Sequence, residues 1–271
     1  MSDMTAEDGV PAVRCRGVGK TWAEGTDRAH MALVDIDLEI ADNEFVVLLG
    51  PSGCGKSTLL YLVAGLEESS AGSIEAHGVP VTQPDSDRSL IFQESSLYPW
   101  LSVADNVTFG LRLQGMSSAK RREVASEYLS KVGLGDVLDK RPDELSGGMR
   151  QRAAVARALT MRPSVLLMDE PFAALDVQTR SKLQDFLIDV WRDSGAAVVF
   201  VTHHIDEAIA LADRIVVVTA RPGRIKHIVK VDLPRPRDPR DNRFHDMRDH
   251  LIDLLADEVD RAFAEQEQVR A

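Results

Sequence analysis

A glycine-rich loop at residues 50–58 is the stretch of this sequence best suited to bind phosphate. It fits the pattern G-x-x-x-x-G-K-[ST]. Glycines let the backbone turn with its N–H groups pointing inward, and the following helix directs its positive end at the same place. We expect Lys56 to reach the β and γ phosphates and the Ser57 hydroxyl to bind Mg²⁺. The predicted phosphate-binding residues are Gly50, Pro51, Ser52, Gly53, Cys54, Gly55, Lys56, Ser57 and Thr58.

Two acidic residues, Asp169 and Glu170, directly follow an apolar run at residues 165–168. Asp169 has the place and charge of a magnesium-binding carboxylate. Glu170 is suited to polarise an attacking water as a general base. Acidic residues are also common at the start of loops, so it is the nearby phosphate loop that favours the catalytic interpretation.

A histidine pair, His203 and His204, follows another apolar run at residues 196–201. A lone histidine at a strand end is more often structural than catalytic. The position of the pair does not decide which of the two faces a site.

A second phosphate-binding element is predicted at Ser146, Gly147 and Gly148, which precede a helix running through Leu159. Bare N–H groups and a hydroxyl face outward there at the positive end of a helix. The alternative is an ordinary helix cap with a flexible lead-in.

The elements that must position these residues alternate between strands and helices. Continuous apolar runs predict buried strands, and an alternating run at Leu33–Ile40 predicts a half-buried one. The carboxyl ends of parallel strands form the usual ligand edge of such a sheet. Further strands are expected at Phe45–Leu49, Ser89–Phe92, Val165–Met168, Ala196–Val201, Arg214–Thr219 and Ile225–Val231, and helices at Lys56–Ala64, Ala119–Val132, Ser146–Leu159, Val177–Asp193, Ile205–Ala212 and Asn242–Phe263. A helical segment therefore interrupts an α/β chain.

The order of these motifs resembles that of the ATP-binding cassette (ABC) ATPases over about residues 12–230, with the run 145–152 as their signature motif. The resemblance implies a P-loop NTPase core with a parallel sheet, an N-terminal antiparallel β-subdomain and an inserted helical subdomain. It implies ATP and Mg²⁺ as cofactors, and a head-to-tail homodimer in which Ser146–Gly148 of one chain covers the γ phosphate bound by the other. It also suggests further roles: adenine stacking for Trp22, contact with Mg²⁺ and the attacking water for Gln93, a D-loop at Ala174–Asp176, and γ-phosphate contact for His203 rather than His204.

A narrower resemblance links the chain to the nitrate/sulfonate/taurine branch of bacterial importers. It rests on the runs 97–100, 103–107, 146–151 and 233–237. In that branch the segment after the Q-loop, the loop that carries Gln93, docks on a membrane permease. Tyr98 and Trp100, if exposed, would suit the docking groove; the alternative is that either one packs inside the helical subdomain. The implied protein powers solute uptake, lies in the cytoplasm on the inner face of the membrane, and depends indirectly on a solute-binding protein. Residues 1–231 would form the nucleotide-binding domain, with the helical subdomain at about 95–160, and residues 232–271 a linker and helix.

Composition narrows the alternatives. The 271 residues carry 43 acidic and 32 basic side chains, a net charge of −11, which disfavours nucleic acid as a partner. A DNA-repair ABC ATPase would need a long coiled coil between residues 57 and 145, and this interval is too short and has no heptads. A translation factor would need two cassettes, and the sequence has one. A GTPase would need a guanine-reading motif, which the sequence lacks. An exporter or lipid-trafficking ATPase is the alternative that the sequence excludes least.

Overall fold

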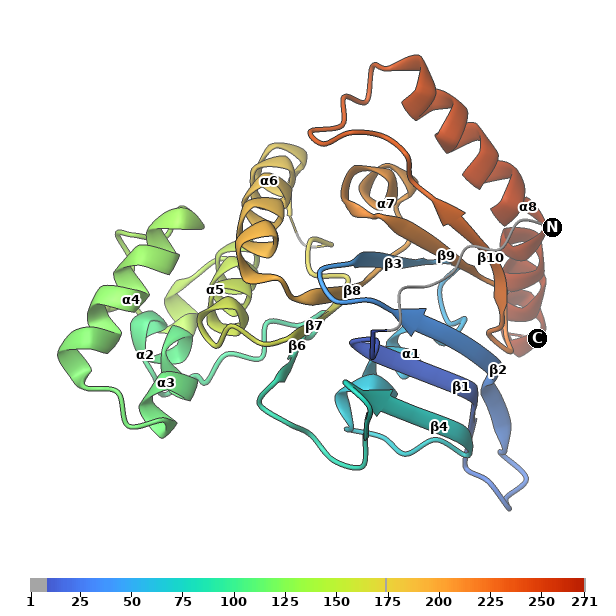
Figure 1. The fold of residues 1–271 in the computed structure, drawn as a ribbon, viewed down its shortest axis with the longest axis horizontal. Helices are drawn as coiled ribbons and strands as arrows, with labels where there is room; N and C mark the ends of the chain where they lie inside the picture. Colours follow the sequence, from blue (N-terminus) through green and yellow to red (C-terminus); the bar gives the residue numbers. More distant parts are fainter. Residues whose placement is uncertain (1–8, 174, 271) are drawn as a thin grey trace.

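The chain forms two sheets with helices packed around them, as seen in a computed structural model that describes residues 9–173 and 175–270, with side chains up to residue 264 (Figure 1). The first sheet is antiparallel and has the strand order β2-β1-β4-β5. Its strands are β1 (Val13–Trp22), β2 (His30–Ile40), β4 (Ala71–Ala76) and β5 (Val79–Pro80).

The second sheet has six strands in the order β10-β9-β3-β8-β7-β6. All neighbouring pairs are parallel except the edge pair of β9 and β10. The parallel arrangement brings the carboxyl ends of the strands to one edge, where ligands bind in such sheets. The strands are β3 (Phe45–Leu49), β6 (Arg88–Ile91), β7 (Val165–Asp169), β8 (Ala197–Thr202), β9 (Arg214–Val218) and β10 (Ile225–Lys230).

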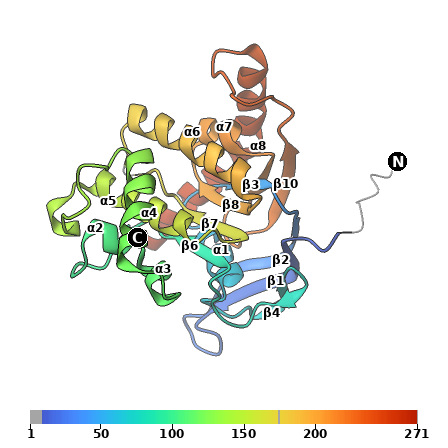
Figure 2. The same ribbon diagram turned by 60° about the vertical axis from the view of Figure 1, so that its left-hand side comes forward.

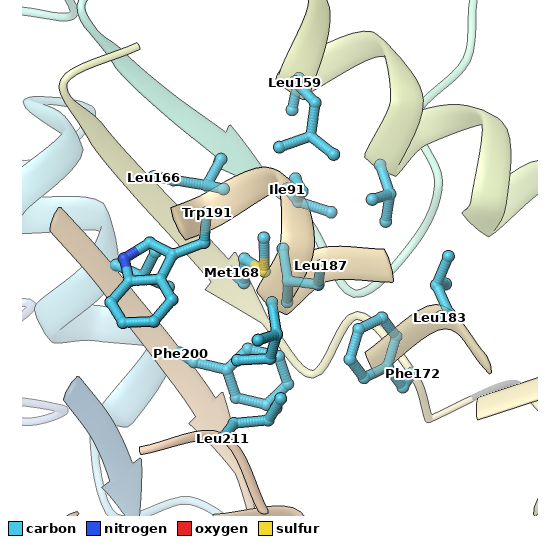
Figure 3. Packing of buried hydrophobic residues seen from close by; sticks show 14 of the residues in the cluster. Ile91, Leu159, Leu166, Met168, Phe172, Leu183, Leu187, Trp191, Phe200 and Leu211 are labelled. Carbon is cyan, nitrogen blue, oxygen red and sulfur yellow. The ribbon is translucent and has the colours of Figure 1, made fainter. Parts of the chain in front are cut away.

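Both faces of this sheet are covered, which explains why β3 is a continuous apolar run. Val46 and Leu48 face α1 (Lys56–Ala64) and the antiparallel sheet. Phe45 and Val47 face the opposite core, which includes α6 (Val177–Ser194), α7 (Ile205–Leu211) and α8 (Asn242–Arg270). Figure 3 shows part of that second core, with Leu183, Leu187 and Trp191 of α6 packed near Met168 and Phe200 of the sheet. The carboxyl end of the buried sheet is thereby held in a fixed place.

A helical subdomain lies between β6 and β7 in the chain and projects to one side of the sheets (Figures 1 and 2). Ser102 caps its first helix, since its hydroxyl accepts a hydrogen bond from Asp105 N at 3.1 Å. The elements of the subdomain are α2 (Val103–Val107), α3 (Phe109–Leu113), α4 (Ser118–Lys131), the short 3₁₀ helix η1 (Pro142–Glu144) and α5 (Gly147–Thr160).

The expected fold class is confirmed, and most predicted elements match within two residues. Of the antiparallel sheet, the residue pattern had identified β2 alone. The alternation is broken in β1, because its register shifts near Gly17 and Gly19. Helix α8 extends beyond the predicted end at Phe263 to Arg270. In the described part of the chain, none of the helices has the length and apolar character needed to span a bilayer.

Candidate functional site

The phosphate loop connects the end of β3 to the start of α1, as its sequence predicts. Gly53 and Gly55 have φ values of 79° and 98°, which side-chain-bearing residues rarely adopt. A Cβ at Gly55 would lie 2.8 Å from the carbonyl oxygen of Ala32, so the loop also depends on glycine to fit against β2.

Lys56 lies under this loop and is 5% exposed. Its Nζ donates hydrogen bonds to the carbonyl oxygens of Gly50 and Pro51, both at 2.8 Å. Its ammonium group also lies 3.6 Å from Cys54 Sγ. Burial raises the pKa of the Cys54 thiol, which stays protonated at neutral pH. The loop therefore presents one buried positive charge and no thiolate.

Ser57 and Asp169 meet across the sheet edge, 112 positions apart in the chain. Ser57 Oγ donates a hydrogen bond to Asp169 Oδ1 at 2.8 Å. Tyr61, one turn further along α1, donates to Asp169 Oδ2 at 3.3 Å. Burial raises the pKa of Asp169, while the hydrogen bonds from Ser57 and Tyr61 oppose that shift. A serine hydroxyl beside a carboxylate is an oxygen donor set that suits Mg²⁺.

Glu170 and His203 form a second pair at the same edge. Glu170 Oε1 lies 3.1 Å from His203 Nδ1, and the Glu170 backbone has a positive φ of 45°. The His203 and His204 rings are 4.1 Å apart. Burial, followed by the charge of His203, lowers the pKa of His204. The 3.1 Å contact shows that His203 contacts the acidic side chain.

A cavity of about 340 Å³ opens over the loop and brings many of the predicted residues together. Those that line it are Trp22, Ser52, Gly53, Gly55, Lys56, Ser57, Thr58, Gln93 and Glu170. Gly50, Pro51, Cys54 and Asp169 are not part of the lining, but each contacts Lys56 or Ser57, which are. Trp22 lies at one side, with Lys20 Nζ 4.4 Å from its ring centroid.

Sequence reasoning missed three further lining residues, His30, Ala32 and Arg221. His30 is paired with Trp22 across β1 and β2. Arg221 Nη2 lies 3.4 Å from the carbonyl oxygen of Gly53. Arg221 directly precedes Pro222 and Gly223, a turn signal that gives no indication of a contact with the phosphate loop. Its contact with the phosphate loop depends on how Gly223 packs against β2, where Gly223 N donates to Ala32 O at 2.9 Å.

Ser146, Gly147 and Gly148 do not line this cavity. Ser146 and Gly147 are exposed at the start of α5, where Ser146 Oγ accepts a hydrogen bond from Met149 N at 3.3 Å. The same helix is linked to the site through Gln151, whose amide donates to Phe92 O at 3.2 Å beside Gln93.

The Asp176 side chain is likewise exposed and caps α6 by accepting from Thr179 N at 3.0 Å. That hydrogen bond lowers the pKa of the Asp176 carboxyl. Ala174, predicted with it as part of the D-loop, lies outside the described residues.

Comparison with known proteins identifies the family. Residues 33–173 match the ABC transporter family. The chain is 50% identical over 228 residues to an uncharacterized ABC transporter ATP-binding protein of Methanocaldococcus jannaschii, covering 84% of this chain and 85% of that one. It is 45% identical to the nitrate import ATP-binding protein NrtD of Synechocystis, covering 80% and 82%. The chain belongs to the ABC transporter family. As an ABC ATPase it uses ATP with Mg²⁺.

A solved structure gives the same fold. The dimeric post-hydrolysis state of the ATP-binding cassette MJ0796, bound to ADP and Pi, superposes with a TM-score of 0.74 at 32% identity. The match covers 82% of this chain and all of that one. The two sheets and the helical subdomain are therefore those of an ABC cassette.

The two aromatic residues expected at a docking surface of this ABC ATPase differ in exposure. Trp100 is 68% exposed, which suits the docking groove. Tyr98 is half-buried rather than exposed, with its ring 4.7 Å from that of Phe109 and the Arg157 guanidinium 5.7 Å from its centroid. Tyr98 therefore supports the subdomain, and Trp100 presents the larger free surface.

Proposed function

We propose that this chain is the ATP-hydrolysing subunit of an importer and that it works as a homodimer. The supporting observation is the separation of two phosphate-binding elements. The Lys56 loop and Glu170 line one cavity, whereas Ser146 and Gly147 are exposed outside it. A second copy would bring its own Ser146–Gly148 over the cavity. This arrangement explains why the cavity is open in one chain and why Ser146 and Gly147 are exposed.

The residues of the cavity then divide the work of hydrolysis. Lys56 and the backbone N–H groups of the loop hold the phosphates of ATP, and Trp22 and His30 flank its adenine base. Ser57 and Asp169 would hold Mg²⁺, aided by Gln93 from the loop after β6. When bound, Mg²⁺ supplies positive charge that offsets the phosphate oxygens. In the proposed dimer, the D-loop of the second copy, which carries its Asp176, would complete the site.

Glu170 is the proposed general base. Its carboxylate lines the cavity and would accept a proton from the water that attacks the γ phosphate. His203 contacts Glu170 Oε1 at 3.1 Å, so it would orient that carboxylate and reach the γ phosphate from the same side. Both side chains project from the carboxyl ends of neighbouring strands, which fixes their relative position.

Import of a small anion is the transport function that the relatives favour. NrtD is a nitrate import ATP-binding protein, and the bicarbonate transport ATP-binding protein CmpC of Synechococcus elongatus is 44% identical over 250 residues, covering 90% of this chain and 38% of that one. We therefore propose that the chain lies on the inner face of the membrane and docks through the Trp100 region on a permease served by a solute-binding protein. Residues 1–231 would form the nucleotide-binding domain, and residues 95–160 would form the helical subdomain that docks on the permease.

Glu170→Gln tests the proposed hydrolysis and dimer together. The amide keeps the size of the side chain and removes its basicity, so the variant should bind ATP, hydrolyse it far more slowly, and elute as a dimer from a sizing column in ATP. The wild-type protein is the control. A variant that stays monomeric with saturating ATP would contradict the proposed dimer.

A further inference from the structure

Residues 255–263 of α8 form one wall of an apolar hollow beside the phosphate loop. Leu255, Val259, Ala262 and Phe263 line it from the helix. Opposite them stand residues 50–52 of the loop and His203. The space is about 350 Å³, and we call it the α8 hollow.

The helix that forms this hollow is fixed in place. Glu258 is 2% exposed, accepts a hydrogen bond from Ala220 N at 2.9 Å, and pairs with Lys226 at 2.8 Å. Lys226 Nζ also donates to Leu254 O at 2.9 Å. These contacts attach α8 to β10 and to the turn after β9, as the position of the helix beside β10 in Figure 1 indicates. The shape of the hollow is therefore held by these contacts of α8.

The rim of the hollow is apolar and faces solvent. Phe263 is 67% exposed and Val259 is 41% exposed, although both are side chains whose burial is favourable. Exposed apolar surface of this kind next to a functional site is typical of an interaction surface.

A second large apolar side chain is exposed on α6. Val177, in the first turn of α6, is 80% exposed. Arg180 of that turn is close enough for its charge to lower the pKa of His204. An apolar projection and an apolar hollow on one chain are features that a two-fold interface can match, because such an interface pairs one surface with a copy of itself.

We propose that the α8 hollow is a contact surface for a second copy of this chain in the ATP-bound dimer. The inference rests on the proposed function, in which the phosphate loop and His203 face the second copy. Because residues 50–52 and His203 form one wall of the hollow, a copy that covers them also reaches Val259 and Phe263. The helix after the cassette core thus extends the dimer interface beyond the nucleotide.

Charge placed on the rim tests this contact. Phe263→Asp and Val259→Asp, each combined with Glu170→Gln, should raise the dissociation constant of the ATP-bound dimer about tenfold or more, since tenfold corresponds to 1.4 kcal/mol and a buried apolar anchor is worth at least that. Sedimentation velocity in ATP over a protein dilution series measures it. The matched control is Val79→Asp, which places the same charge at a 66% exposed valine in the antiparallel sheet.

ATP affinity and thermal unfolding of each monomer show whether a variant remains folded. Phe263→Ser, which removes the ring without adding charge, serves if an aspartate variant unfolds, and it should weaken the dimer in the same direction. Unchanged or tighter dimers in the rim variants would overturn the contact. A Glu170→Gln parent that does not dimerise in ATP would instead overturn the proposed function.

Discussion

At the scale of single residues, the phosphate loop and its carboxylate were predictable because each belongs to a short motif with its own chemistry. Lys56, Ser57 and Asp169 lie where the pattern places them. Tyr61 was not predictable, because its bond to Asp169 depends on the distance between α1 and β7 rather than on sequence spacing. Arg221 reaches Gly53 from a hairpin 168 positions away, which no local pattern records.

Replacing Lys56 tests the loop directly. The Nζ atom lies under the loop, bonded to Gly50 O and Pro51 O, where it can approach phosphate without a large movement. Lys56→Ala should weaken ATP binding about tenfold or more, because a charge-assisted hydrogen bond contributes roughly 1.5–3 kcal/mol. Calorimetric titration with ATP measures the affinity.

The control for that experiment is Lys182→Ala, which removes an exposed lysine of α6. It should bind ATP like the wild type. Equal affinity in Lys56→Ala and Lys182→Ala would contradict the assigned role of the loop lysine.

At the scale of elements, strands buried on both faces were the easiest to predict. β3 matches its predicted bounds because all five residues are apolar and buried. β4 was missed, since Ala71, Gly72 and Ser73 carry no apolar alternation and pair with β1 through their backbone. The predicted end of α8 fell at Phe263 because the apolar spacing stops there, while the helical backbone continues.

The start of α5 allows an ordinary helix cap to be separated from a phosphate-binding element. Aspartate caps helices about as well as serine, so Ser146→Asp should leave the unfolding temperature nearly unchanged. Its negative charge should nevertheless repel the triphosphate held by the second copy, and ATP hydrolysis should fall about tenfold or more. Differential scanning fluorimetry and a phosphate-release assay measure the two effects.

Ser117→Asp is the matched control, because the exposed Ser117 makes the same kind of capping bond at the start of α4, where its hydroxyl accepts from Lys120 N at 3.4 Å. It should preserve both stability and hydrolysis. Full activity in Ser146→Asp would show that Ser146 only caps α5 and does not bind phosphate.

Glu207 of α7 makes the contact between helices depend on pH. It is 6% exposed and accepts a hydrogen bond from Gln184 of α6 at 3.0 Å. Burial raises its pKa, so the folded chain keeps the proton at pH values where the unfolded chain has lost it. The stability contributed by this group is present below the unfolded pKa of about 4.3 and is lost as pH rises through the folded pKa.

Glu207→Gln removes that dependence while keeping an oxygen to accept from Gln184. The variant should be more stable than the wild type at neutral pH, and the difference should vanish below about pH 4. Urea unfolding across this range measures it, with the exposed Glu24→Gln as control. A constant difference at every pH would contradict the buried-carboxylate explanation.

At the scale of the whole molecule, a single chain carries each phosphate-binding element once and keeps them apart. The sequence already indicated this, because the resemblance to ABC ATPases pairs the loop of one chain with the signature of another. The α8 hollow was beyond that reasoning, since it depends on how the terminal helix packs against β10 and the loop.

Mixing two defective variants distinguishes a shared site from one contained in a single chain. In a head-to-tail dimer of Lys56→Ala with Ser146→Asp, one site carries both defects and the other carries none. Mixed at equal amounts, such chains form mixed dimers half of the time, so activity should return to roughly a quarter of the wild-type value if the two-fold pairing holds. Each variant alone, assayed at an ATP concentration below the weakened affinity of Lys56→Ala, should show about a tenth of the wild-type activity or less.

The matched control mixes Lys56→Ala with Glu170→Gln. Both residues line the same cavity of one chain, so each site of that mixed dimer contains one defect and activity should not return. Recovery in the first mixture and none in the second is the result that a site shared between two chains requires. Recovery in neither mixture would mean that Ser146 and Lys56 of one chain act at the same ATP site. That result would contradict the head-to-tail dimer.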